Sequence, residues 1–95
     1  MSTKTQKGNQ GRLLIQEDLQ HQTGFPILYR LHAQGNESDS HFSISVTIPD
    51  EETCEVDAGS DLLRALNYYR RIKDGNVTPC TLTEILQDLR YLDNF

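Results

Sequence analysis

The sequence predicts an α+β domain in which a three- to four-stranded antiparallel sheet is followed by two antiparallel helices packed on one face of that sheet. Three observations lead to this prediction. Apolar and polar side chains alternate in the first half of the chain, apolar residues recur at helical spacing in the second half, and the connecting segments are short. Strands that come first and helices that come after are typical of an α+β fold.

Two segments show the strand pattern most clearly. Apolar side chains occupy every second position in residues 27–33 and again in residues 42–48, with mostly polar side chains between them. Because successive side chains of a strand point to opposite faces, each segment has an apolar face and a polar face, as in an antiparallel sheet that meets water on one side. The polar residues 34–40 predict a hairpin loop between these strands.

Shorter segments complete the predicted sheet. Residues 12–19 are expected to form the first strand, and residues 53–56 a short fourth one. Residues 21–26 are predicted to be a turn, because Gly24 and Pro26 both interrupt regular structure.

The N-terminal segment differs in composition from the rest of the chain. Residues 1–11 contain no apolar side chain after Met1, so they cannot bury enough surface to offset the entropy lost on folding. We therefore expect a disordered tail over residues 1–11 and a single α+β domain over residues 12–95.

The first predicted helix follows the sheet. Its apolar positions at helical spacing are Leu62, Ala65, Leu66, Tyr69 and Ile72. Either Ser60 or Asp57 is available as the N-cap, and Gly75 stands where a left-handed residue would end the helix.

The second predicted helix begins with Thr81 and Glu84, which have the spacing of a capping box. Its apolar stripe consists of Leu82, Ile85, Leu86, Leu89 and Leu92. The short linker between the helices favours an antiparallel pair.

Charge and hydropathy exclude some classes of partner. The formal net charge of −5 disfavours nucleic acid, because proteins that bind nucleic acid use basic side chains to neutralise phosphates. No apolar run approaches the roughly 20 residues that cross a bilayer, and the N-terminus has no apolar core of a secretory signal. These patterns predict a cytoplasmic protein without a membrane partner.

The sequence predicts no catalytic, cofactor-binding or metal-ligating residue. The spacings of zinc sites, nucleophile elbows and phosphate-binding glycine loops do not occur. His32 and His41 flank the hairpin loop, where a cross-strand polar pair is the ordinary interpretation, and the acidic residues 50–61 lack the order of a calcium loop. No cofactor or metal is therefore expected, and the sequence favours a non-enzymatic protein.

Two cysteines, Cys54 and Cys80, are too few for a disulfide scaffold, so we expect both to be reduced and packed as small hydrophobic residues. Cys80 precedes Thr81, where the positive end of a helix could make a thiol reactive. A catalytic thiolate also needs a base, and the sequence pattern supplies none.

One surface pattern suggests a binding role. Arg64, Tyr68 and Arg71 lie at positions i, i+4 and i+7 of the first helix, opposite the predicted buried stripe, and Tyr91 lies on the acidic outer face of the second helix. Tyrosine and arginine are enriched among residues that contribute binding energy at protein interfaces. These four residues are the candidate partner-binding positions.

The segment 76–89, together with residues 29–31 and 44–46, resembles a family of short clostridial-type (Firmicutes) bacterial proteins that is known only as a domain of unknown function. The resemblance spans about residues 27–90 and rests on hydrophobic and capping positions. It implies a bacterial cytosolic domain and carries no active residue to transfer.

Three functions stay open on the sequence alone. The favoured one is a protein-interaction or regulatory module that uses the helix ridges or an open sheet edge, to which a peptide or a second copy of the chain can bind. The second is a small-ligand binder or minor enzyme with a pocket between sheet and helices, near Cys80 and Tyr29. The third is a weak nucleic-acid binder that uses the basic residues Arg64, Arg70, Arg71 and Lys73.

Overall fold

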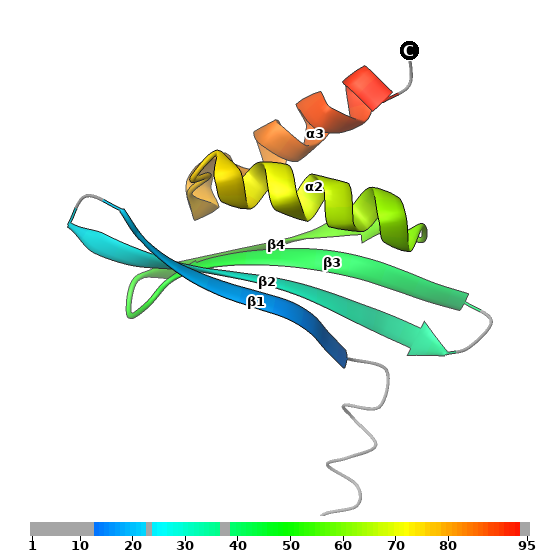
Figure 1. The fold of residues 1–95 in the computed structure, drawn as a ribbon, viewed down its shortest axis with the longest axis horizontal. Helices are drawn as coiled ribbons and strands as arrows, with labels where there is room; N and C mark the ends of the chain where they lie inside the picture. Colours follow the sequence, from blue (N-terminus) through cyan, green and yellow to red (C-terminus); the bar gives the residue numbers. More distant parts are fainter. Residues whose placement is uncertain (1–12, 23, 37–38, 94–95) are drawn as a thin grey trace, which may run out of the picture.

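The computed structural model describes residues 13–22, 24–36 and 39–93, and both the predicted tail and the predicted start of the domain at Arg12 lie outside them. The described chain forms β1 (Leu13–Gln22), β2 (Phe25–Asn36), β3 (Asp39–Ile48) and β4 (Glu52–Gly59), then helix α2 (Leu62–Asp74), the 3₁₀ turn η1 (Pro79–Thr81) and helix α3 (Leu82–Asp93). The strands make one antiparallel sheet in the order β1-β2-β3-β4. Both helices lie on the same side of this sheet, so the predicted α+β fold is confirmed (Figure 1).

The register of the central strands explains the hydrophobic core. Leu31 pairs with Ile44, and Ile44 pairs in turn with Val56, so the apolar positions of β2, β3 and β4 form continuous rows on the side that the helices cover. The buried apolar residues are Ile27, Tyr29, Leu31, Phe42, Ile44, Val46, Ala58, Ala65, Tyr68, Tyr69, Ile72, Val77, Leu82 and Leu86. Removing this surface from water is the main stabilising contribution to a domain of this size.

The strands extend further than the sequence predicts. β1 continues to Gln22 and β2 already begins at Phe25, so the predicted turn over residues 21–26 is wrong at both ends. The chain reverses around Gly24, whose φ of 95° is a left-handed conformation that glycine adopts without strain. Pro26 pairs with His21 near the start of β2, a place where a strand tolerates proline.

The ends of α2 differ from the predicted caps. Asp61, rather than Ser60 or Asp57, is the N-cap, and its carboxylate accepts hydrogen bonds from the backbone N–H groups of Leu63 and Arg64 at 3.0 and 3.4 Å. This arrangement satisfies two of the donors that a helix start leaves without a partner.

At the other end of α2, Asn76 rather than Gly75 takes the left-handed conformation, with a φ of 55°. The N–H of Asn76 donates to the carbonyl of Lys73, and the N–H of Val77 donates to the carbonyl of Ile72. These two bonds form a Schellman motif. Glycine is favoured at position 75 because a Cβ there would lie only 3.1 Å from the Arg71 carbonyl oxygen.

The predicted capping box of α3 is also wrong. Thr81 is the last residue of η1, and its hydroxyl donates to the carbonyl of Thr78 at 3.2 Å. An N-cap needs a non-helical backbone, which Thr81 does not have because the chain has already entered a helical turn.

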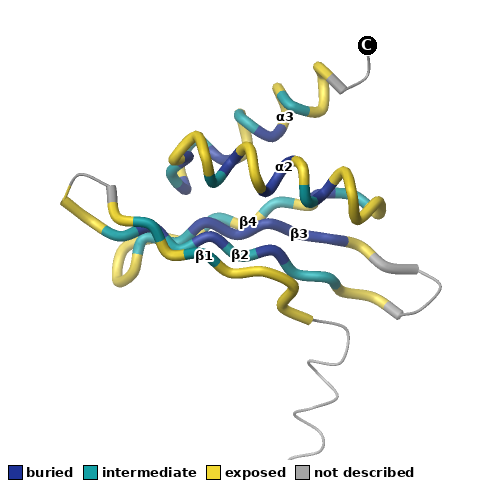
Figure 2. The backbone as a smooth tube through the Cα atoms, in the orientation of Figure 1, coloured by how far each residue is buried: buried dark blue, intermediate teal, exposed yellow. Residues whose placement is uncertain are grey.

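The buried faces of both helices differ from the predicted stripes. In α2 the buried residues are Ala65, Tyr68, Tyr69 and Ile72, whereas the predicted Leu62 is exposed. In α3, Leu92 is 62% exposed although it continues the predicted stripe. In Figure 2 the C-terminal half of α3 rises away from the sheet, and Leu92 near its end stays largely exposed.

Candidate functional site

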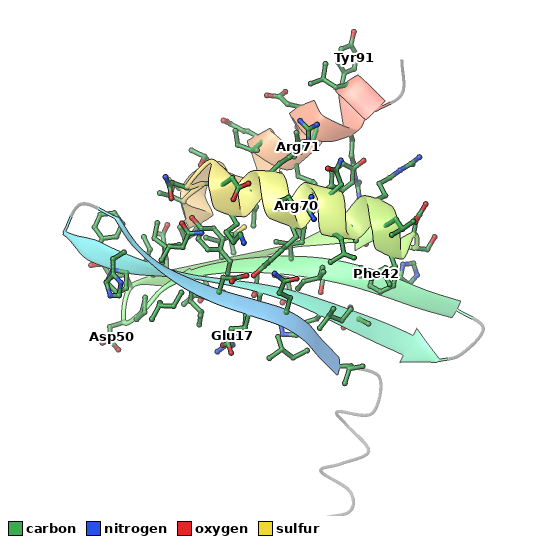
Figure 3. All side chains as sticks on the ribbon, viewed as in Figure 1. Glu17, Phe42, Asp50, Arg70, Arg71 and Tyr91 are labelled. Atoms are coloured by element: carbon green, nitrogen blue, oxygen red, sulfur yellow. The ribbon has the colours of Figure 1, made fainter. Side chains whose placement is uncertain are left out.

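The four predicted partner-binding residues do not share one surface. Arg64, Arg71 and Tyr91 are exposed, but Tyr68 is only 3% exposed, so the predicted outward ridge on α2 is wrong at its middle residue. The reason is that α3 packs against α2 on this side and covers Tyr68, which lines two hollows between the helices. Tyr91 projects from the far end of α3, away from the sheet (Figure 3).

Two hollows lie along the helix pair. The smaller one, of about 200 Å³, is lined by Asn67, Tyr68, Arg71, Leu89 and Leu92. The larger one, of about 330 Å³, lies where β4 passes into α2 and is lined by Ala58, Gly59, Ser60, Asp61, Arg64, Tyr68 and Arg90. The sequence analysis named Arg64 and Tyr68 but not Arg90, which reaches this hollow only through the packing of α3 beside β4.

The predicted pocket near Tyr29 and Cys80 is not supported by the structure. Tyr29 is completely buried, and its hydroxyl donates to the carbonyl of Val77 at 3.0 Å. Cys80 is exposed rather than packed in the linker as predicted, with its Sγ 3.5 Å from the Thr78 hydroxyl. Cys54 is half-buried, and both thiols are free.

β1 is the least covered element of the sheet. It pairs with β2 along one edge, and among the described strands none pairs with its other edge. The closest packing of the helices is on β2, β3 and β4, whereas β1 meets α2 through a few polar side chains around Asp18. Its exposed apolar side chains are Leu13, Leu14, Ile15 and Leu19. A β-bulge between Leu14 and Gln16 interrupts the regular pairing at its N-terminal end.

A polar contact attaches β1 to α2. The Tyr69 hydroxyl donates to Asp18 Oδ2 at 2.7 Å and also lies 3.1 Å from the carbonyl oxygen of Tyr29. The Nε2 of Gln16 donates to the same carboxylate oxygen at 3.1 Å, and Lys73 Nζ lies 3.8 Å from it. The two hydrogen-bond donors and the positive charge of Lys73 favour the ionised carboxylate. Asp18 can therefore remain charged on the face of the sheet that the helices cover.

The acid–base properties of this contact follow from its geometry. The hydrogen bond from Tyr69 is the largest influence on the Asp18 carboxyl and lowers its pKa; burial opposes this, and smaller contributions from Gln16 and Lys73 lower the pKa further. Burial and the Asp18 carboxylate together raise the pKa of Tyr69, and burial raises the pKa of Tyr29. Both tyrosines therefore stay neutral hydrogen-bond donors over the physiological range.

The other face of the sheet carries polar rows. Ser43 pairs with His32 on one side and with Asp57 on the other. Ser43 is only 4% exposed, and its Oγ has no hydrogen-bond partner among the described residues. A nucleophilic triad needs the acid beside the histidine and an accessible serine hydroxyl. Here the serine stands between the other two, so the row does not have the arrangement of a hydrolase.

The remaining candidate ligands are dispersed. His32 pairs with Ser43 and His41 with Gln34, so the two histidines are not directly opposite each other. In the described ranges, no group of three or more His, Cys, Asp and Glu residues is placed to hold a metal ion. Neither described helix combines the length and the apolar character that crossing a membrane requires.

Comparisons of the chain with protein-family models, with curated proteins and with solved structures found no match. The resemblance to a clostridial-type family therefore stays a prediction from the sequence, and the functional argument rests on the geometry of this chain.

Proposed function

We propose that the chain is a non-enzymatic protein-interaction module whose binding element is the free edge of β1. The supporting observation is that none of the described strands pairs with the outer edge of β1: none of its side chains from Leu13 to His21 is buried, and Leu19 is 55% exposed. An uncovered strand edge presents backbone donors and acceptors in a row, to which a further strand can add.

The partner that we favour is a second copy of the chain, joined by antiparallel pairing of the two β1 strands. With Leu19 on the two-fold axis, Glu17 of one copy would face His21 of the other, which brings opposite charges together when the histidine is protonated. Glu17, Leu19 and His21 share the face away from the helices, because they pair with Arg30, Leu28 and Pro26 of β2. Figure 3 shows Glu17 on that face.

The apolar surface also fits such a pairing. Leu28 lies beside Leu19 on the same face, so a symmetric dimer would place four leucines in one continuous row across the joined sheets. The β-bulge at Leu14 and Gln16 discourages pairing along the whole strand. We therefore expect residues 17–21 to form the intermolecular ladder.

The setting that we propose is the bacterial cytoplasm. The family resemblance implies it, and two free cysteines, one of them exposed, suit a reducing compartment.

Analytical ultracentrifugation over a range of concentrations tests the proposal. The wild-type chain should sediment as a dimer at high concentration, and Leu19→Lys should be a monomer because two lysines would meet on the axis. The matched control is Leu63→Lys, an equally drastic change at an exposed position of α2, which should leave the dimer intact. A wild-type monomer at the concentrations used for NMR, or a Leu19→Lys variant that still dimerises, would overturn the proposal.

A further inference from the structure

The geometry points to a second binding site, independent of β1: the hollow that Arg64 and Arg90 share binds a small oxyanion, such as a phosphate monoester or a small carboxylate. The two arginines come from different helices, Arg64 from the first turn of α2 and Arg90 from the last turn of α3. Both line the same space of about 330 Å³, which is at the lower end of the volume of small-molecule sites, roughly 300–1,000 Å³.

Arg90 is held in place for such a role. Its Nη2 donates to the backbone carbonyl of Asp57 at 2.6 Å, which ties the end of α3 to β4. A guanidinium group has five N–H donors in one plane, so this single bond leaves others to point elsewhere. The planar arrangement of these donors matches two oxygens of a carboxylate or phosphate.

The charge of the lining favours an anion. Two arginines and one acid, Asp61, line the hollow, and the Asp61 carboxylate accepts hydrogen bonds from the N–H groups of Leu63 and Arg64 as the cap of α2. The carboxylate of Asp57, next to the lining, accepts from the N–H of Gly59 at 2.9 Å. The lining residues thus include one more basic than acidic side chain, in a chain of net charge −5. A concave positive site attracts anions more strongly than a flat surface with the same charges.

The remaining lining groups suit a polar ligand of small size. Ser60 contributes a hydroxyl at the rim, and Tyr68 lines the hollow from α2. Gly59 has a φ of 90°, which lets the chain turn from β4 toward the start of α2. A Cβ at Gly59 would meet no atom within 4 Å, so glycine is favoured here for its backbone conformation and not for lack of space.

An NMR titration tests the site directly. Inorganic phosphate and acetate are added in separate experiments to ¹⁵N-labelled protein, with sodium chloride adjusted to hold the ionic strength constant. We expect saturable shifts of the amides of residues 58–64 and of the Arg64 and Arg90 side-chain N–H groups. Saturation by both probes indicates general oxyanion binding, whereas saturation by phosphate alone assigns the site to phosphate esters.

The variants separate the site from general surface charge. Arg64→Gln should weaken binding about tenfold or more, because it removes a charge-assisted hydrogen-bond donor. The matched control is Arg70→Gln, which removes the same charge from an exposed position of α2 outside the hollow and should bind like wild type.

Arg90→Gln should also weaken binding, and a thermal melt shows whether loss of its bond to Asp57 has disturbed the fold. Arg64→Gln keeps the test decisive if Arg90→Gln is unstable, because the bond to the Asp57 carbonyl that ties α3 to β4 comes from Arg90. Shifts that do not saturate, or equal affinities for Arg64→Gln and Arg70→Gln, would overturn the inference. None of these outcomes depends on whether β1 pairs.

Discussion

The two edges of the sheet are stabilised in different ways. β4 lies beneath the helices: Ala58 is buried, Cys54 and Val56 are partly buried against the core, and Arg90 of α3 bonds to its backbone. β1 at the opposite edge has no buried side chain between Leu13 and His21. It is held by its ladder with β2 and by polar contacts.

The polar contacts of β1 are few, and they act on both faces. Asp18 bonds to Tyr69 on the helix side, and Glu17 bonds to Arg30 at 3.0 Å on the other side, where both charged groups are exposed. Exposed ion pairs contribute little, typically about 0–1 kcal/mol. Burial therefore fixes β4 with the core, whereas β1 is tied to α2 mainly by the Asp18–Tyr69 contact, and we expect β1 to open separately.

The largest expected effect is on the covered side. Leu86→Ala should lower the free energy of unfolding by about 2–5 kcal/mol. The side chain of Leu86 packs from α3 into the core, and removing it leaves a cavity. Urea denaturation followed by circular dichroism measures this. Leu92→Ala, on the same helix but 62% exposed, is the control and should change stability little. Leu89 is only partly buried, so Leu89→Ala should fall between the two. Equal stability of Leu86→Ala and wild type would show that this face of α3 is not part of the core.

A smaller effect is expected at the contact between β1 and α2. Tyr69→Phe should cost about 1–3 kcal/mol, because it removes a buried donor to a charged acceptor while keeping the aromatic ring. Hydrogen exchange should speed up more for the β1 amides than for those of β3. The control is Tyr91→Phe, at a 64% exposed position. Uniform acceleration across all four strands would contradict the idea that β1 opens as a separate unit.

The smallest expected effect is on the pH dependence of the free energy of unfolding. The folded state lowers the pKa of Asp18 below its ordinary value of 3.8, so the ionised carboxylate stabilises the fold above that value, and this stabilisation is lost as the pH falls through the lowered pKa. Asp18→Asn should therefore be less stable than wild type at neutral pH, and the difference should disappear in strong acid. Urea midpoints measured as a function of pH check this. A difference for Asp18→Asn that persists in acid would assign the effect to packing rather than charge.

Part of the candidate site could be predicted from the sequence and part could not. Local rules place Arg64, Tyr68 and Arg71 on one side of α2, which is correct, but they do not say what lies against that side. The spacing Ala65, Tyr68, Tyr69 and Ile72 is as regular as the predicted stripe, and only the position of α3 shows that Tyr68 belongs to the buried set. Cys80 was mispredicted for the same reason, since a linker residue is buried or exposed according to how its turn is oriented.

By itself, the sequence determined the fold class, the central strands and the existence of two helices. Alternation and helical spacing are local patterns, set by residues that are close together in the sequence. Only the tertiary structure decided the uncovered edge of β1 and the position of Arg64 and Arg90 around one hollow. Both depend on how the two helices pack on the sheet and on each other. That packing is set by contacts between segments far apart in the chain.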